Sequence, residues 1–171
     1  MIINNKWAMP NKNTFSINPI KNLIDKVICD NEPKVIVDPF ANSSTYGTIT
    51  NDLNEIYDTT YHMDALEFLK NIPTNSVDMV LYDPPYSPRQ IKEVYDNIGN
   101  RPDGNYTKSS FWSKQKDEIS RITKSGGIVI SFGWNSNGIG KSRGFTKEEI
   151  LLVSHGGNHN DTIVTVDRKS V

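Results

Sequence analysis

The sequence has little cysteine, no long apolar run and almost no net charge. Cys29 is the only cysteine in 171 residues, so the chain can form neither an intrachain disulfide nor a cysteine-based metal cluster. No stretch of about 18 apolar residues occurs, and the start MIINNKWAMPNKN lacks an apolar core of signal-peptide length. We therefore expect a cytoplasmic protein that does not bind or span a membrane.

The charge balance bears on the partners that this chain can bind. There are 19 Lys and Arg against 20 Asp and Glu, a formal net charge of -1. Strong binding to nucleic acid usually needs clustered positive charge for the phosphates, so the overall charge argues mildly against it unless local clusters exist. The length suits one domain over 1–171, in which we expect 1–14 to be a loose segment and no separate target-recognition domain to exist.

Apolar periodicity predicts alternating helices and strands. Residues 18–29 have apolar side chains at helical spacing, with Pro19 in the first turn. Two further helices are predicted at 65–71 and 109–122, and Gly126-Gly127 should interrupt the chain after the second of them. Short apolar runs typical of buried strands occur at 34–37, 48–50, 77–82 and 128–132, with a weaker one near 60–62.

The C-terminal part predicts a hairpin. Residues 148–153 and 162–166 have strand character and are joined by the turn HGGNHND. Together with the alternating helices and strands, this pattern indicates an α/β fold with a mostly parallel sheet and a C-terminal antiparallel hairpin strand. Residues 87–108 are interpreted as a long loop with one helical turn near 91–95.

Four acidic residues follow the predicted strands closely. They are Asp38, Asp52, Asp64 and Asp83. Ligands of open α/β sheets bind at the carboxyl ends of the strands, where these side chains are expected to meet. Such a row can bind a cationic ligand that carries several hydrogen-bond donors, and a sulfonium cofactor with an ammonium, a ribose diol and an adenine amine is one. Asp64 can equally serve as the N-cap of helix 65–71.

The tetrapeptide Asp83-Pro84-Pro85-Tyr86 directly follows an apolar strand. The exocyclic amine of adenine is a poor nucleophile because its lone pair is delocalised into the ring. The Asp83 carboxylate and the Pro84 carbonyl can accept the two N–H bonds of that amine and so free its lone pair. The proline rings fix where the carbonyl points, and Tyr86 can stack on a base that has left its helix.

DPPY after a strand, with VDPF before it and SPRQ after it, resembles the DNA N6-adenine methyltransferases, particularly the compact phage and prophage type. The resemblance covers about Phe15 to Val166. It implies a Rossmann-like S-adenosylmethionine-dependent methyltransferase fold with a seven-stranded sheet, S-adenosylmethionine bound by the first half, and methyl transfer to the N6 amine of adenine in DNA. The order of the motifs is that of the subgroup without an inserted target-recognition domain.

The resemblance also assigns roles to individual residues of the cofactor site. Asp38, Pro39 and Phe40 match the cofactor loop, and Asp52 matches the acid that accepts from the ribose hydroxyls. Asp64, followed by Ala65, matches the acid that binds the cofactor's adenine amine. Two upstream residues fall where the family closes over the methionine moiety; they are Phe15 and Pro19.

The cofactor loop departs from the family pattern. Where relatives have glycines, this chain has Ala41-Asn42-Ser43-Ser44. Asn42 tolerates a positive φ angle, and Ser43 or Ser44 can donate to the cofactor carboxylate.

Basic residues concentrate in the two loops that follow strands 77–82 and 128–132. They are Arg89, Lys92, Arg101, Lys108, Lys141 and Arg143, and we expect them to contact phosphates, although ordinary solvated loops would show the same composition. Both loops are expected to leave the sheet at its catalytic edge. His155 and His159 lie four residues apart in a glycine-rich turn without further ligands, so no metal site is expected.

Two alternatives to a DNA adenine enzyme remain open. RNA adenine or a cytosine amine uses the same geometry, although the related cytosine enzymes more often begin the motif with Ser. A non-catalytic subunit with the same fold would explain the altered loop and the low charge. Without a recognition insert, target recognition would come from the two loops, from a homodimer or from a partner subunit.

Overall fold

A computed structural model describes residues 1–97, 99 and 109–171. Its seven-stranded sheet has the order β1-β6-β7-β5-β4-β2-β3. The strands are β1 (Ile2–Trp7), β2 (Ile36–Asp38), β3 (Ile49–Thr50), β4 (Val77–Tyr82), β5 (Thr123–Gly133), β6 (Phe145–Ser154) and β7 (Thr162–Lys169). Neighbouring strands are parallel except around β7, which runs antiparallel to both β5 and β6. The predicted α/β class with an antiparallel C-terminal hairpin is therefore confirmed.

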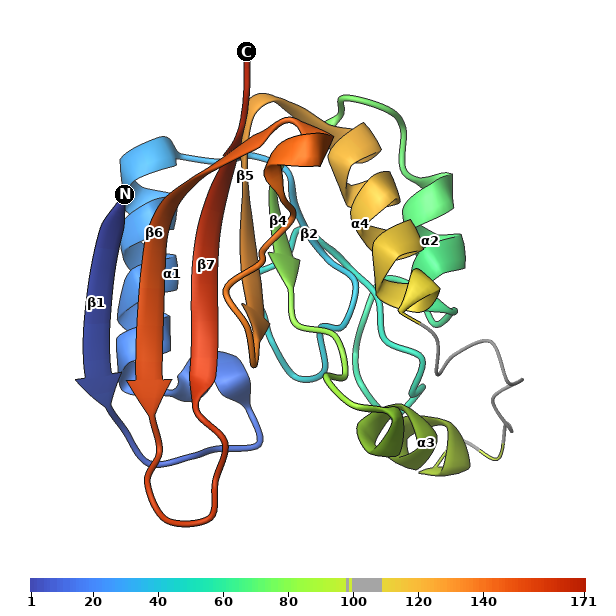
Figure 1. Cartoon of the computed structure of the whole chain (residues 1–171). Coiled ribbons are helices and arrows are strands. Elements are labelled where there is room, and N and C mark those ends of the chain that lie inside the picture. The colour runs from blue at the N-terminus through green and yellow to red at the C-terminus, as the bar shows by residue number, and fades with distance from the viewer. Residues whose placement is uncertain (98, 100–108) are drawn as a thin grey trace.

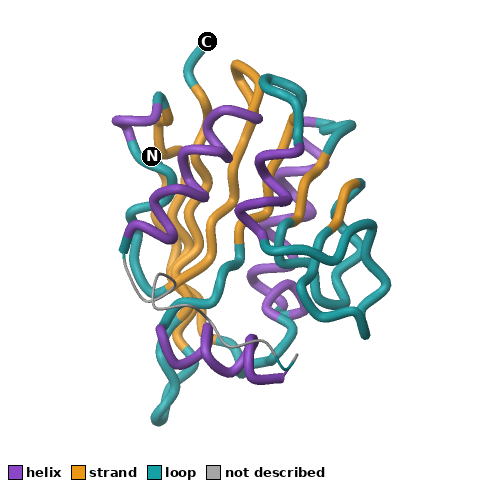
Figure 2. Tube along the Cα trace, turned by 90° about the vertical axis from the view of Figure 1, so that its right-hand side faces the viewer, coloured by secondary structure: helices purple, strands orange, loops and turns teal. Residues whose placement is uncertain are grey.

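Helices cover both faces of the sheet. They are α1 (Asn18–Asn31), α2 (Ala65–Asn71), α3 (Pro88–Asn97) and α4 (Ser110–Ile122), with short 3-10 turns η1 (Thr14–Ser16) and η2 (Lys141–Arg143). Helix α1 lies on one face and α2 and α4 on the other, while α3 lies beyond the carboxyl ends of the strands (Figures 1 and 2). None of the helices described in the structure has the length and apolar character needed to cross a membrane.

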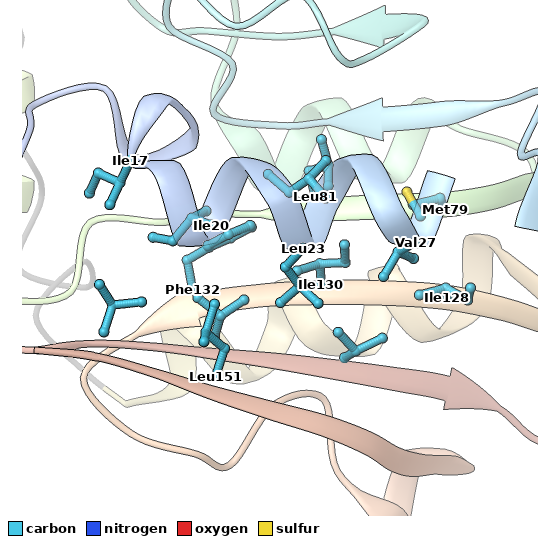
Figure 3. Packing of buried hydrophobic residues seen from close by; sticks show 14 of the residues in the cluster. Ile17, Ile20, Leu23, Val27, Met79, Leu81, Ile128, Ile130, Phe132 and Leu151 are labelled. Carbon is cyan, nitrogen blue, oxygen red and sulfur yellow. The ribbon is translucent and has the colours of Figure 1, made fainter. Parts of the chain in front are cut away.

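The core forms because the central strands are apolar on both sides. Met79 and Leu81 of β4 belong to the cluster that α1 completes, whereas Val80 and Tyr82 pack toward α2 and α4. Figure 3 shows the side chains of α1 meeting those of the central strands. A strand covered on both faces has no polar alternation, which is why β4 is apolar without interruption from Met79 to Tyr82.

The N-terminal segment differs from the expectation of a loose tail over 1–14. Residues 2–7 form the edge strand β1, which pairs in parallel with β6 so that Ile3 lies opposite Ile150. All six side chains of β1 are exposed, so apolar periodicity cannot reveal the strand. Residues 60–62, predicted as a weak strand, form only one isolated bridge, between Asn51 and Tyr61. The sheet therefore has the seven strands expected, but one of them is β1 and not the segment 60–62.

Two further elements are longer than predicted. Helix α3 spans ten residues where one turn was expected. Strand β5 starts at Thr123, and Gly126-Gly127 lies inside it at an irregularity of the β4–β5 register. Gly126 has a φ of 76°, which allows the chain to bulge without ending the strand.

Candidate active site

A cavity of about 840 Å³ opens at the carboxyl ends of β2, β3 and β4. Its walls come from η1, the loops after β2 and β3, the start of α2, the DPPY segment and α3. Ligand pockets usually measure roughly 300–1,000 Å³, so this cavity can hold a nucleoside-sized cofactor.

The loop after β2 takes its shape from a contact with Asp52. Asn42 has a φ of 51°, which agrees with the prediction that it tolerates a positive φ angle. Its backbone N–H donates to Asp52 Oδ2 at 2.9 Å, and Asp52 Oδ1 accepts from the N–H of Asn54 at 2.9 Å. Asp52, Asn42 and Ser43 all line the cavity. A loop without glycine thus reaches a left-handed conformation through asparagine and is held there by the acid that follows β3.

Asp38 lies behind the cavity wall instead of on it. Its side chain is completely buried, whereas Pro39 and Phe40 line the cavity. Asp38 Oδ1 accepts from the N–H of Phe40 at 3.2 Å, while Oδ2 is buried without a well-formed hydrogen bond from any described residue. Burial raises the pKa of the Asp38 carboxyl well above its ordinary value, and the nearby charges of Asp83 and Asp52 add to this.

Asp64 caps a helix, which is one of the two roles weighed for it, and it also lines the cavity. Its Oδ1 accepts from the N–H groups of Leu66 and Glu67 and so caps α2. Its Oδ2 accepts from the hydroxyl of Tyr95 on α3 at 3.0 Å. Asp64 and Ala65 both line the cavity, so the cap also faces the space where a ligand would lie.

Asp83 and Tyr86 meet at the end of β4. The Tyr86 hydroxyl donates to Asp83 Oδ1, and Thr14 lies beside both side chains. Desolvation raises the pKa of Asp83, and the contacts with Tyr86 and Thr14 partly oppose this. Burial also raises the pKa of the Tyr86 hydroxyl, which keeps it protonated as a donor. The Tyr86 ring lies 5.7 Å from that of Trp134, so the two rings flank one side of the motif.

The backbone of DPPY is held in place by two side chains from neighbouring helices. Trp112 of α4 donates through its indole N–H to the Pro85 carbonyl at 3.0 Å. The Tyr86 N–H donates to Gln90 Oε1 of α3 at 2.7 Å. Both contacts fix the direction of the tetrapeptide, and Pro84 and Pro85 line the cavity beside Asp83.

Of the two upstream residues assigned to the cofactor, one lies at the cavity and the other does not. Phe15 lines the cavity, with its ring 4.8 Å from that of Phe132 and 6.2 Å from that of Tyr46. Pro19 does not line it. As the second residue of α1, Pro19 faces a shallow groove beside Trp7 of β1, so its assignment to the cofactor is wrong.

No protein-family model matches the sequence, and no curated protein matches it. Solved structures match the fold. A methyltransferase from Archaeoglobus fulgidus described as SAM-dependent superposes with a TM-score of 0.60 at 10% identity, over 89% of this chain and 94% of that one. The N-methyltransferase NodS from Bradyrhizobium japonicum gives 0.60 at 7% identity, over 95% and 100%. A Burkholderia thailandensis N1-methyltransferase with bound S-adenosylhomocysteine gives 0.53 at 10% identity, over 87% and 76%.

The chain has the fold of the S-adenosylmethionine-dependent methyltransferases. At these identities the likeness shows the fold alone, because one fold can carry many different functions.

Of the basic residues, those on α3 are near the cavity. Arg89 forms an exposed ion pair with Glu93 at 2.9 Å, and Lys92 is exposed to solvent. Arg101 and Lys108 lie outside the described residues. Lys141 and Arg143 belong to η2, directly before β6. The loop after β5 leaves the sheet at the catalytic edge, as expected. Because β6 runs parallel with β5, however, the start of β6 lies at the opposite edge, and Lys141 and Arg143 lie there with it (Figure 1).

Arg143 has a structural role there. Its guanidinium pairs with Asp117 at 2.7 Å and donates to the Ile139 carbonyl and to Ser113 on α4. His155 is likewise engaged within the fold: its ring nitrogens lie 2.9 Å from the Ala8 carbonyl and 2.8 Å from the Thr162 hydroxyl.

Sequence reasoning missed several residues of the site. Asn51 is buried and links the Pro39 carbonyl to the backbone of Met63, which joins the two cofactor-side loops. Thr14 and Tyr95 contact the acids from distant segments. For Asn51, its place beside Asp52 at a strand end was an available signal; for Thr14 and Tyr95, the sequence holds none, because their partners are 69 and 31 positions away.

Proposed function

We propose that this chain is an S-adenosylmethionine-dependent methyltransferase that methylates the N6 amine of adenine in DNA. The observation that carries the proposal is the position of Asp83-Pro84-Pro85-Tyr86, which follows a central strand and lines the same cavity as Asp52 and Asp64. The methyltransferase fold supports the reaction type, and the tetrapeptide supports an aromatic amine as the acceptor.

The cavity fits the cofactor in three respects. Asp52 and Asp64 both line it, where ribose hydroxyls and an adenine amine need acceptors. The loop Pro39–Tyr46 forms another wall with Ser43, a donor suited to a carboxylate. The buried Asp38 lies behind the same wall, and because burial raises its pKa, a cationic group bound nearby would favour its ionised form. When bound, S-adenosylmethionine supplies an electrophilic methyl group on a sulfonium.

Asp83 activates the acceptor amine in this proposal. Its carboxylate accepts one N–H bond of the amine and the Pro84 carbonyl accepts the other, which localises the lone pair on nitrogen. Tyr86 and Trp134 provide aromatic surface for the base. In the structure Tyr86 donates to Asp83 Oδ1, so the Tyr86 hydroxyl and the incoming amine compete for that oxygen or share it.

Mass spectrometry of nucleic acid tests this assignment. Purified protein with S-adenosylmethionine is incubated separately with duplex DNA, single-stranded DNA and RNA, and each is digested to nucleosides. We expect N6-methyl-2′-deoxyadenosine from the DNA samples. If only the RNA sample gave N6-methyladenosine, the substrate would be RNA, and N4-methylcytosine nucleosides would contradict the adenine assignment. Cofactor binding without any methylated product would favour the non-catalytic subunit.

A further inference from the structure

Helix α3 contacts both the acid assigned to the cofactor's adenine and the backbone of the catalytic tetrapeptide. At its start, Gln90 Oε1 accepts from the Tyr86 N–H at 2.7 Å, and Ser87 caps the helix by accepting from the Gln90 N–H at 3.2 Å. At its other end, the Tyr95 hydroxyl donates to Asp64 Oδ2 at 3.0 Å. One short helix thus spans the two places where different ligands are proposed to bind.

The helix is anchored between these contacts by buried side chains. Ile91 and Tyr95 lie one turn apart and are 1% and 9% exposed, in a cluster with Phe111 of α4. Trp112, which packs against the same cluster, donates to the Pro85 carbonyl. A displacement of Tyr95 would therefore be transmitted along α3 to Tyr86 and through the cluster to Pro85, because close-packed side chains transmit small shifts.

The chemistry of Asp64 determines how a ligand would act on this helix. Its Oδ1 is engaged by two backbone N–H groups of α2, so Oδ2 is the oxygen that a second donor in the cavity would approach. A carboxylate oxygen has two lone-pair directions and can accept from two donors. The Tyr95 hydroxyl and an adenine amine can thus share Oδ2, each making the position of the carboxylate more favourable for the other.

We propose that α3 couples cofactor binding to the order of the target-base site, with Tyr95 as the positioning residue. This inference rests on the proposed function. Binding of the cofactor's adenine amine at Asp64 fixes Tyr95, Tyr95 fixes α3, and α3 holds the Tyr86 backbone through Gln90. Binding of the methyl donor thus stabilises the arrangement of the tetrapeptide that an incoming base needs.

Hydrogen exchange measured by mass spectrometry tests the coupling without any nucleic acid. We compare the amides of 86–91 in the free protein and with saturating S-adenosylhomocysteine. Couplings between sites typically amount to a factor of about 5–150, so we expect exchange to slow by at least about fivefold in the wild type. Tyr95→Phe, compared at its own saturating ligand concentration, should lose this slowing.

Two controls separate the coupling from simple damage. Tyr61→Phe removes a hydroxyl from a ring that packs on Phe68 and does not line the cavity, and this variant should keep the slowing. S-inosylhomocysteine, which has a carbonyl in place of the adenine amine, should bind without slowing exchange in the wild type. Slowing that persists in Tyr95→Phe, or that S-inosylhomocysteine produces equally, would overturn the coupling. Failure of the wild type to bind S-adenosylhomocysteine would instead overturn the proposed function, and the coupling with it.

Discussion

The segments that follow β4 and β5 are alike in composition and end in different places. Both begin at the carboxyl end of a buried parallel strand, and both are rich in glycine, asparagine and basic residues. The first forms α3 across the cavity, while the second returns along α4 to the opposite edge of the sheet (Figure 1). The next element explains the difference: β6 runs parallel with β5, so 134–144 must cross to the other edge without a helix to carry it.

This difference shows that loop composition alone does not locate a functional loop. Charged residues of neighbouring elements hold the second segment in place: Lys116 of α4 donates to the Gly138 carbonyl at 2.7 Å, and the Ile139 N–H donates to the buried Asp167 of β7 at 3.1 Å. The first segment instead directs Gln90 and Tyr95 to site residues. We therefore expect changes after β4 to affect ligands and changes after β5 to affect stability.

The largest effect is expected from Asp83→Ala at the start of the first segment. Loss of the carboxylate removes the acceptor of the amine, and methyl transfer should fall by about 10³-fold or more. Methyl transfer from labelled S-adenosylmethionine to DNA measures it, with calorimetry to show that S-adenosylhomocysteine still binds. Asp117→Ala, which removes an exposed partner of Arg143, is the control and should leave transfer unchanged. An active Asp83→Ala variant would refute the catalytic role.

The pH dependence of transfer should report the same carboxylate. Asp83 must be ionised to accept the amine, and desolvation raises its pKa above the ordinary value. The rate kcat/KM should therefore decrease about tenfold per pH unit once the pH falls through this raised pKa, and it should level off above it. A profile that stays flat down to pH 4 would show that an ionised Asp83 is not required.

Gly138→Ala should cause the largest loss of stability in the second segment. Gly138 has a φ of 58°, and a Cβ added there would collide with the buried carboxylate of Asp167. We expect a loss of about 3 kcal/mol in the free energy of unfolding by urea. Gly144→Ala is the matched control, because its φ of 82° is equally strained for alanine but its Cβ would meet open space. Equal losses in the two variants would show that the collision contributes nothing.

Arg143→Ala should destabilise the fold without weakening nucleic-acid binding. It removes the contacts to Asp117, Ser113 and the Ile139 carbonyl, which we expect to cost about 1–3 kcal/mol. Urea unfolding and fluorescence anisotropy with labelled DNA measure the two properties. Reduced DNA affinity at unchanged stability would restore Arg143 to the nucleic-acid surface.

Lys92→Ala should leave stability almost unchanged and weaken nucleic-acid binding, and its effect should be the smallest of the five. Lys92 is exposed on α3, so stability should change by no more than about 0.5 kcal/mol. If it contacts a phosphate, the slope of log K against log salt should decrease by about one. An unchanged slope would limit the nucleic-acid surface to other residues.

The sequence predicted most of the fold because the central strands and α1 are apolar in regular patterns. It predicted α2 and β4 with the boundaries that the structure shows, since Asp64 caps one and turn residues bound the other. It did not predict β1, whose side chains are all exposed and whose pairing depends on backbone hydrogen bonds. The predicted strand 128–132 is also shorter than β5, because Gly126-Gly127 signals a break where the structure has a bulge.

The site divides in the same way. Asp52, Asp64 and Asp83 reach one cavity because strand ends of a parallel sheet share an edge. The burial of Asp38 and the crossover that moves Lys141 and Arg143 to the far edge depend on three-dimensional packing. The contact between Tyr95 and Asp64 joins residues from different elements, and no spacing rule indicates it.

Isothermal titration calorimetry with S-adenosylmethionine tests the central claim most directly, which is that the acids beside DPPY form a cofactor site. We expect one molecule to bind per chain, and Asp52→Asn to weaken binding by about tenfold through loss of one charged acceptor. Asp161→Asn, on the turn between β6 and β7 and outside the cavity lining, is the matched control and should bind like the wild type. Absence of binding by the folded wild type, or equal binding by Asp52→Asn, would contradict the assignment of this cavity to the cofactor.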